Sequence, residues 1–456
     1  MFSTGFTKSY WPLVTVLGVM LIFFAAENSL SQETDEWKGK LKDGTIITRV
    51  DLIRILKEHE KWFQSDGREG KRAELSDAYL VDVELDSAFL LGARLNRANL
   101  SAANLNLANL RDAEMNNAIL RMAKLNRANL QIAKLNGADL FGAKLKGAEM
   151  WKCELDSAHP TYAELDSAIL FGAKLKGAYL IQTKLNSADL AEAELNGAIL
   201  QGADLDNAIL KSTKLNGADL QGVDFSFAVF EPDPQSIVSG RAFAGARNLS
   251  KMTFQVTPDA MGALREAFRK AGMRQQEREV TYAIKHTERL RAWHEGLDDK
   301  VESIFNFIFF ETTCGYGMYP LRPLRLLASL ILFFTIPYII ALKTHGPAGI
   351  RVTWRKREFL VQSRPSRVWL RLHRKWRWLP IKWLRDLRVA FYFSLLSAFH
   401  IGWRELNVGN WITRMQFRNY TLHATGWVRF VSGLQSLISV YLLALWVLTY
   451  FGRPFE

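Results

Sequence analysis

Cysteine is scarce in this chain: Cys153 and Cys314 are the two among 456 residues. Two cysteines cannot build a disulfide framework, and neither lies near residues that could join it as metal ligands. A single disulfide between them stays open on composition alone. The sequence also lacks a recognisable set of nucleophile, base and orienting group. We therefore expect no enzyme, no metal site and no cofactor.

Over most of the chain neither basic nor acidic residues are in large excess, although the net charge is +13. The excess lies mostly between Arg351 and Arg388, where thirteen Lys and Arg accompany two acidic residues. A basic run beside apolar segments indicates a membrane surface rather than nucleic acid. The partner that we expect is a lipid bilayer, and a nucleic acid is not expected.

The chain is instead rich in one pattern, a five-residue unit that repeats without insertion from Ala73 to Phe230. The first place is Ala in twenty-seven of thirty-two units, and the third place is Leu, Met or Phe with the exception of Pro160. In extended backbone the first and third residues lie on one face and the second on the other. No unit of this length can bury its Leu alone, so the pattern predicts a solenoid with a shared core, in which Cys153 is a small inward residue.

Units such as Ala-Asn-Leu-Ser-Ala at 98–102 and Ala-Asp-Leu-Gln-Gly at 218–222 resemble the pentapeptide-repeat family. The resemblance implies a right-handed, quadrilateral β-helix with four units per coil. The thirty-two units would then form eight coils, roughly 38 Å long at about 4.8 Å per coil. Some members of the family imitate DNA with an acidic surface. Residues 73–228 carry 15 basic and 20 acidic residues with the signs interleaved, which argues against that role.

Four units per coil would place residues twenty apart directly above one another. The outward second places then alternate in sign at every coil, in the order Glu74, Arg94, Glu114, Lys134, Glu154, Lys174, Glu194 and Lys214. Opposite charges at strand spacing favour one register, by ~0.2 to 1 kcal/mol per pair. Pro160 has no N–H for the ladder, so we expect a local break around His159 and Pro160.

The sequence before the repeat contains two other patterns. Residues 1–31 include an apolar run from Leu13 to Ala26, which is typical of a signal peptide or an N-terminal anchor. Residues 37–72 form an N-terminal capping region, with an amphipathic pattern from Arg49 to Phe63 that predicts a helix over the open end of the first coil.

The sequence after the repeat, residues 231–310, predicts a linker followed by two charged helices. Their expected ranges are about 259 to 271 and 273 to 295, with Gly272 between them. Their ionisable residues are expected in solvent on the polar faces; these are Glu277, Glu279, His286 and His294.

Residues 311–456 predict an α-helical membrane domain. Uncharged stretches predict spans at 324–343 and 428–451, and between them lie the basic loop 351–388 and a re-entrant segment at 389–403 that is too short to cross. This order resembles the pore domain of two-transmembrane ion channels, and in particular the potassium-channel pore. The expected fold class is thus an all-β right-handed quadrilateral β-helix plus an α-helical membrane domain.

The residues after the expected pore helix resemble a potassium-channel filter in part. They are His400, Ile401, Gly402, Trp403, Arg404 and Glu405. Arg404 departs from the family pattern and would place positive charge where a cation should pass.

A weaker filter-like stretch comprises Thr313, Cys314, Gly315, Tyr316 and Gly317. No span precedes it and prolines follow it, which favours a turn that enters the first span.

Small polar residues share one face of the last expected span: Ser432, Ser436 and Ser439, with Gln435 beside them. Such residues usually mediate helix packing, and lining of a pore is the alternative.

Two functions follow from these patterns. The first is an ion channel with a degenerate pore, assembled as a homo-oligomer. The second is a non-conducting membrane scaffold whose β-helix binds a protein partner. In either case we expect a multi-pass protein of the bacterial inner membrane. Since short basic loops stay in the cytoplasm, the β-helix is expected on the periplasmic side, and the segment at 389–403 would enter from the cytoplasm.

Overall fold

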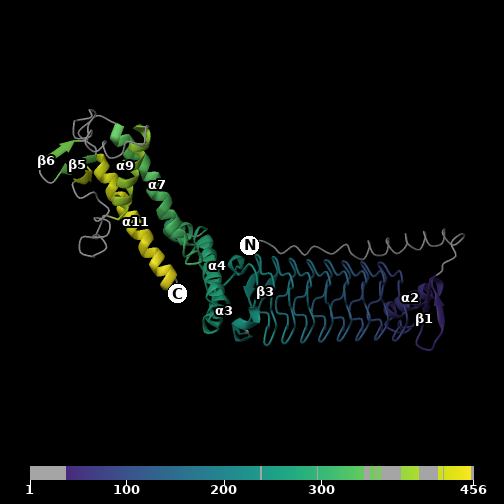
Figure 1. The fold of residues 1–456 in the computed structure, drawn as a ribbon. Helices are drawn as coiled ribbons and strands as arrows, with labels where there is room; N and C mark the ends of the chain where they lie inside the picture. The colour runs from purple at the N-terminus through teal and green to yellow at the C-terminus, as the bar shows by residue number, and fades with distance from the viewer. Residues whose placement is uncertain are drawn as a thin grey trace, which may run out of the picture. The chain divides into compact units, whose positions relative to one another are not determined.

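The computed structural model describes residues 37–236, 239–294, 296–343, 350–354, 357–360, 382–399, 420–424 and 426–452. It forms two compact units, of which the first holds the repeat and ends at Arg247, and the second begins in the main at Asn248 (Figure 1). The signal peptide or anchor predicted over 1–31 lies outside the described residues.

The repeat forms a solenoid with twenty residues per coil. The second place of each unit makes a parallel bridge to the residue twenty positions later, as Glu74 does with Arg94 and Arg94 with Glu114. Main-chain hydrogen bonds accompany these bridges; Leu95 N donates to Glu114 O at 2.7 Å. Each side of a coil is so short that most pairings between coils are single bridges. β3 (Ile209–Lys211) and β4 (Val229–Glu231), in contrast, pair as strands of three residues. The predicted four-unit coil is confirmed.

The core of the solenoid consists of the Ala and Leu places. Ala98, Leu100 and Leu140 are at most 1% exposed. The chain turns at the fifth place of each unit, which adopts positive φ, 55° at Asn117 and 68° at Gly137. This conformation explains the frequent Gly, Asn, Asp and Ser at the fifth place.

The predicted charge column is present. Arg94 lies 2.8 Å from Glu74 and 3.7 Å from Glu114, and higher in the column Lys174 lies 2.9 Å from Glu154. These side chains are between 29% and 53% exposed, so each pair contributes little to stability, whereas the alternation of charge favours one register.

The predicted break at Pro160 is also confirmed, and it is confined to one rung. The described ladder has no bridge between His159 and Tyr179, although the coils on either side are paired. The Thr161 hydroxyl donates to Tyr179 O at 3.1 Å and so replaces the missing N–H. The His159 and Tyr179 rings stack at 4.5 Å. The coil therefore keeps its register across the proline.

The first coil is covered by α2 (Arg49–Gln64), as predicted, and by a hairpin that was not predicted. Strands β1 (Lys38–Lys40) and β2 (Ile46–Thr48) are antiparallel, and Lys40 pairs with Tyr79 of the first coil. The buried His59 of α2 accepts the Ala73 N–H through Nδ1 at 3.3 Å. Helix and hairpin together occupy an edge that would otherwise invite aggregation.

The solenoid continues past its predicted end at 230. After η1 (Pro234–Ser236) the chain returns over the last coil, where Leu220 N donates to Ala242 O and Arg247 N to Val223 O. Phe243, in η2 (Gly240–Phe243), is fully buried and contacts Phe225 and Phe230. Three aromatic rings close this end of the core. Phe225 and Phe230 follow the five-residue pattern, whereas Phe243 comes after the pattern has ended, so the pattern could not reveal this closure.

The second unit is mainly helical. Its elements before the first long apolar helix are η3 (Leu249–Lys251), α3 (Asp259–Lys270), α4 (Arg274–Ala292), α5 (Leu297–Asn306), the π-helix η4 (Phe307–Glu311) and α6 (Thr312–Cys314). The elements that follow are α7 (Arg322–Lys343), β5 (Ile350–Trp354), β6 (Arg357–Leu360), α9 (Lys382–Ala398), β7 (Tyr420–Ala424) and α11 (Trp427–Phe451). α3 and α4 are the two predicted charged helices, and each of their ends lies within three residues of the predicted position.

Two helices of this unit, α7 and α11, are long and apolar enough to cross a membrane by length and composition. They pack with α9 through apolar clusters that include Phe334 and Phe393, and Leu327 and Leu442. The sequence predicted a purely helical domain, and this was wrong. β6, β5 and β7 form a three-stranded antiparallel sheet. β5 and β6 come from the expected basic loop, where hydrophobic periodicity was too weak to predict strands.

The solenoid register predicts unequal effects at neighbouring places. Leu140→Ala should lower the free energy of unfolding by about 2 to 5 kcal/mol, because it removes buried methyl groups and leaves a cavity. Lys134→Ala, at an exposed second place, should be nearly neutral. Urea unfolding followed by circular dichroism would measure both. Equal losses at the two positions would contradict the register.

Candidate functional site

A buried polar cluster lies where α7, α9 and α11 meet. Gln435 of α11 is fully buried. Its Nε2 donates to the main-chain oxygen of Ser394 at 2.9 Å and to the Ser394 hydroxyl at 2.8 Å. The Tyr338 hydroxyl of α7 donates to Gln435 Oε1 at 2.8 Å. One side chain thus joins all three helices.

Serines extend this cluster on both sides of Gln435. The Ser394 hydroxyl donates to Ile331 O at 2.6 Å, and the Ser432 and Ser397 hydroxyls lie 2.9 Å apart. Ser439 donates to Gln435 O and is buried, as is Ser436. The interpretation of this face as a helix-packing face is confirmed. Gln435 and Ser432 have partners on other helices of the same chain, and Ser439 bonds within α11, which is unfavourable for the alternative that these side chains line a pore.

The structure does not place the main filter-like stretch. His400, Ile401, Gly402, Trp403, Arg404 and Glu405 lie outside the described residues. The segment before them is a continuous helix, α9, which begins at Lys382 inside the expected basic loop rather than at 389.

The weaker filter-like stretch forms a compact turn between α6 and α7. Gly315, Tyr316 and Gly317 have positive φ and are buried. Gly315 N donates to Glu311 O, and Tyr319 N donates to Cys314 O at 3.0 Å. A single left-handed turn of this kind differs from the extended row of free carbonyls that a filter requires. Thr313 and Cys314 belong to the end of the preceding helix, where Cys314 is buried and free, as is Cys153.

A cluster that the sequence did not reveal surrounds Glu311, next to this turn. The Glu311 carboxylate pairs with His286 Nδ1 at 3.0 Å and with Arg289 Nε at 2.5 Å, and the Tyr282 hydroxyl lies 3.5 Å away. Burial raises the pKa of Tyr282, and the nearby Glu311 charge acts in the same direction.

The expectation that the ionisable residues of α4 lie in solvent was therefore wrong for His286, and also for Glu277, which is buried. Tyr282, His286 and Arg289 lie three and four residues apart, on one helical face. This spacing was visible in the sequence, but their partner Glu311 was not, because it lies 25 positions from His286 at the end of a π-helix.

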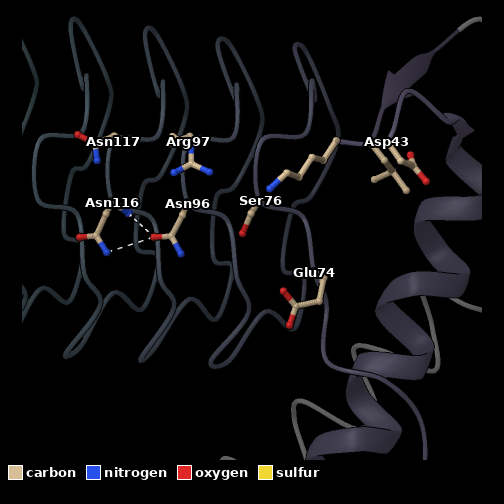
Figure 2. A pocket seen from close by; sticks show the side chains of 9 residues that line it. Asp43, Glu74, Ser76, Asn96, Arg97, Asn116 and Asn117 are labelled. Atoms are coloured by element: carbon tan, nitrogen blue, oxygen red, sulfur yellow. Dashed lines mark hydrogen bonds between the residues drawn. The ribbon is translucent and has the colours of Figure 1, made fainter.

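The solenoid carries a depression of about 960 Å³ beside its first coils (Figure 2). Its walls include Lys42, Asp43, Glu74 and Arg97, so both signs of charge are present. Beside it, hydrogen bonds from Arg97 lower the pKa of Asp77 to about 2.

Asparagine side chains continue along the floor of this depression. Asn116 donates to Asn96 Oδ1 from its main-chain N and from Nδ2, at 3.0 and 3.1 Å. These groups bond to one another from coil to coil, as Figure 2 shows. Across the residues that the structure describes, no group of His, Cys, Asp or Glu side chains is arranged to hold a metal ion.

The three-helix junction predicts a large effect from one amide. Gln435→Ala removes the hydrogen bonds that the buried amide makes with the Tyr338 hydroxyl and with Ser394, which should cost about 1 to 3 kcal/mol. Leu434→Ala, on the exposed face of the same helix, is the matched control and should change little. Thermal unfolding of the purified protein in detergent would measure the difference. Similar melting temperatures for the two variants would show that the amide does not hold the junction.

The repeat matches a known family. The model described as Pentapeptide repeats matches this chain at residues 73–112, 93–131, 173–211 and 188–226. No curated protein is significantly similar to the chain.

Two solved structures, one of them described as a pentapeptide repeat protein, are also similar to part of the chain. HetL, involved in heterocyst differentiation regulation in the cyanobacterium Nostoc, is 29% identical, with 41% of this chain and 90% of HetL covered and a TM-score of 0.27. QnrB1, a plasmid-mediated fluoroquinolone resistance protein, is 17% identical, with 37% of this chain and 90% of QnrB1 covered and a TM-score of 0.20. The matched repeats and the twenty-residue ladder lead to one conclusion: the part of this chain between residues 73 and 226 is similar to pentapeptide repeats.

Proposed function

We propose that this protein is a non-conducting membrane scaffold, anchored by α7 and α11, whose β-helix binds a protein partner. The observation that carries the proposal is the closed junction of the three helices. Its polar groups, centred on Gln435, bond to one another within one chain. Polar side chains that bond to one another between helices stabilise helix packing. The side chains around Gln435 are therefore not free to line a water-filled path.

Apolar side chains exposed on the solenoid support the second half of the proposal. Five of them lie on one side and its following corner, which we call the Tyr79 side, at Tyr79, Ile119, Met122, Tyr162 and Tyr179, whereas Leu107, Ile132, Ile169 and Phe227 are exposed elsewhere on the solenoid. Met122, Tyr162 and Tyr79 are each more than half exposed. Aromatic and Met side chains are enriched at protein interfaces, and an apolar patch of this kind favours a protein partner.

The charge column on a neighbouring side offers a contrast. Its Lys and Glu are paired along the solenoid, as Lys174 is with Glu154. A surface of paired, solvated charges offers little apolar area that a protein partner could bury. The Tyr79 side is therefore the preferred docking face.

The membrane placement rests on length, composition and charge. We place α7 and α11 across a bacterial inner membrane with the basic residues between Arg351 and Arg388 in the cytoplasm, which puts the β-helix on the periplasmic side.

An ion channel is the second candidate, and one observation favours it. Two long apolar helices flank the shorter α9, and all three pack on one another, which is the order of parts in a two-transmembrane pore. In that case several copies would have to assemble around residues 400–405.

Electrical recording separates the two candidates. We expect the purified protein to give no current in planar bilayers, and Arg404→Gly to leave the bilayer equally silent. A current that changes its conductance or ion preference in Arg404→Gly would overturn the scaffold and establish the channel, because Arg404 would then lie at the narrow point.

Site-specific crosslinking tests the docking face. A photoreactive residue at Tyr162 in living cells should yield a crosslinked species of defined mass, because the Tyr79 side would be covered by its partner. The same residue at Lys174 is the control and should give none. Equal crosslinking at both positions would show that the Tyr79 side is not a specific interface.

A further inference from the structure

We propose that the segment formed by α5 and η4, residues 297–311, lies in the membrane–water interface and inserts an apolar stripe among the lipid acyl chains. The inference rests on the proposed membrane placement of α7 and α11. It adds a third point of contact with the bilayer, one that does not cross it.

The stripe consists of large apolar side chains at helical spacing. They are Leu297, Val301, Ile304, Phe305 and Ile308, all at least 45% exposed, with Leu297 at 81%. Positions separated by three and four residues share one helix face. A soluble surface rarely leaves such a row uncovered, and a helix of this kind is typical of an interfacial segment.

The other faces of the same segment are polar or held by protein. Asp298, Asp299 and Glu302 follow the stripe around the helix. Ser303, further round, is buried and donates to Arg289 O of α4 at 3.0 Å. The segment is therefore fixed to the protein along one face while its apolar stripe points away from it.

The π-helix keeps the one carboxylate at the end of the segment away from lipid. Glu311 is turned inward to His286 and Arg289, whereas Phe307, Ile308 and Phe309 of the same turn remain exposed. A π-turn shifts the helix face, which lets apolar side chains continue outward while the acid finds its partners.

The depth of the segment follows from its contact with α11. The Tyr441 hydroxyl donates to Phe309 O. Leu442, the next residue, belongs to the same apolar cluster as Leu327 of α7. Leu327 lies just inside the exposed Arg325, which marks the charged end of α7. The carbonyl of Phe309 thus lies near the level where the apolar surface of α7 begins, which is the level of an interfacial helix, and α11 continues past this level to Phe451.

The charge of the segment indicates the class of lipid. Its four acids, Asp298, Asp299, Glu302 and Glu311, outnumber the single Lys300. Attraction to anionic headgroups is therefore not expected, and burial of the apolar stripe supplies the binding energy. We expect insertion into zwitterionic phosphatidylcholine.

Fluorescence quenching in nanodiscs tests this inference on the full chain. Single cysteines replace Val301, Ile308, Glu302 or Leu332, each labelled with an environment-sensitive dye; Cys153 and Cys314 are buried. Leu332 is an exposed apolar residue of α7 and reports whether that helix is in the membrane. Glu302 is the matched control, next to Val301 on the polar face.

Lipids brominated on the acyl chains should quench the dye in Val301→Cys, Ile308→Cys and Leu332→Cys, whereas aqueous iodide should quench it in Glu302→Cys. Iodide quenching at Val301 equal to that at Glu302, with Leu332 quenched by lipid, would overturn the interfacial segment and leave the membrane placement intact. Protection of Val301 from both quenchers would overturn it in favour of a second protein surface. Absence of lipid quenching at Leu332 would overturn the membrane placement itself.

Discussion

The main-chain ladder between coils is the constraint on which the solenoid depends. Each five-residue unit is too short to form a core of its own, so its inward Ala and Leu are buried only if the next coil stacks on it at a spacing of twenty residues. Side-chain identity then follows from position. Small residues fit the first place, Leu fills the third, and residues that tolerate positive φ turn the corner.

A ladder of this kind has two open ends, and the protein closes them by different means. At the start, a hairpin pairs with Tyr79 and α2 places His59 against the first unit. At the far end, Phe243 joins Phe225 and Phe230. Both closures satisfy or cover groups that would otherwise recruit other chains. The helical unit relies on a different principle, because there the buried amide of Gln435 joins three helices that its apolar residues alone would not orient.

The sequence predicted the elements whose pattern is periodic. The coil length, the charge column and α2 follow from spacing, since each buries or exposes residues at a fixed interval. The defect follows from the missing N–H of Pro160, and α7 and α11 follow from long uncharged stretches. The closures were harder. Phe243 and the β1–β2 hairpin act through contacts with the first or last coil, which no local period records. The Glu311 cluster was missed for the same reason, because Glu311 and His286 lie 25 positions apart and belong to different helices.

The alternating charge column also limits how the solenoid can change in length during evolution. Loss of a single five-residue unit would rotate every later side by a quarter turn, so that the Tyr79 side and the charge column would each be cut in two. Loss of one whole coil would keep the sides aligned but would stack Arg94 against Lys134, like upon like. Removal of two coils restores both the sides and the alternation. The domain can therefore lengthen or shorten most easily in steps of forty residues.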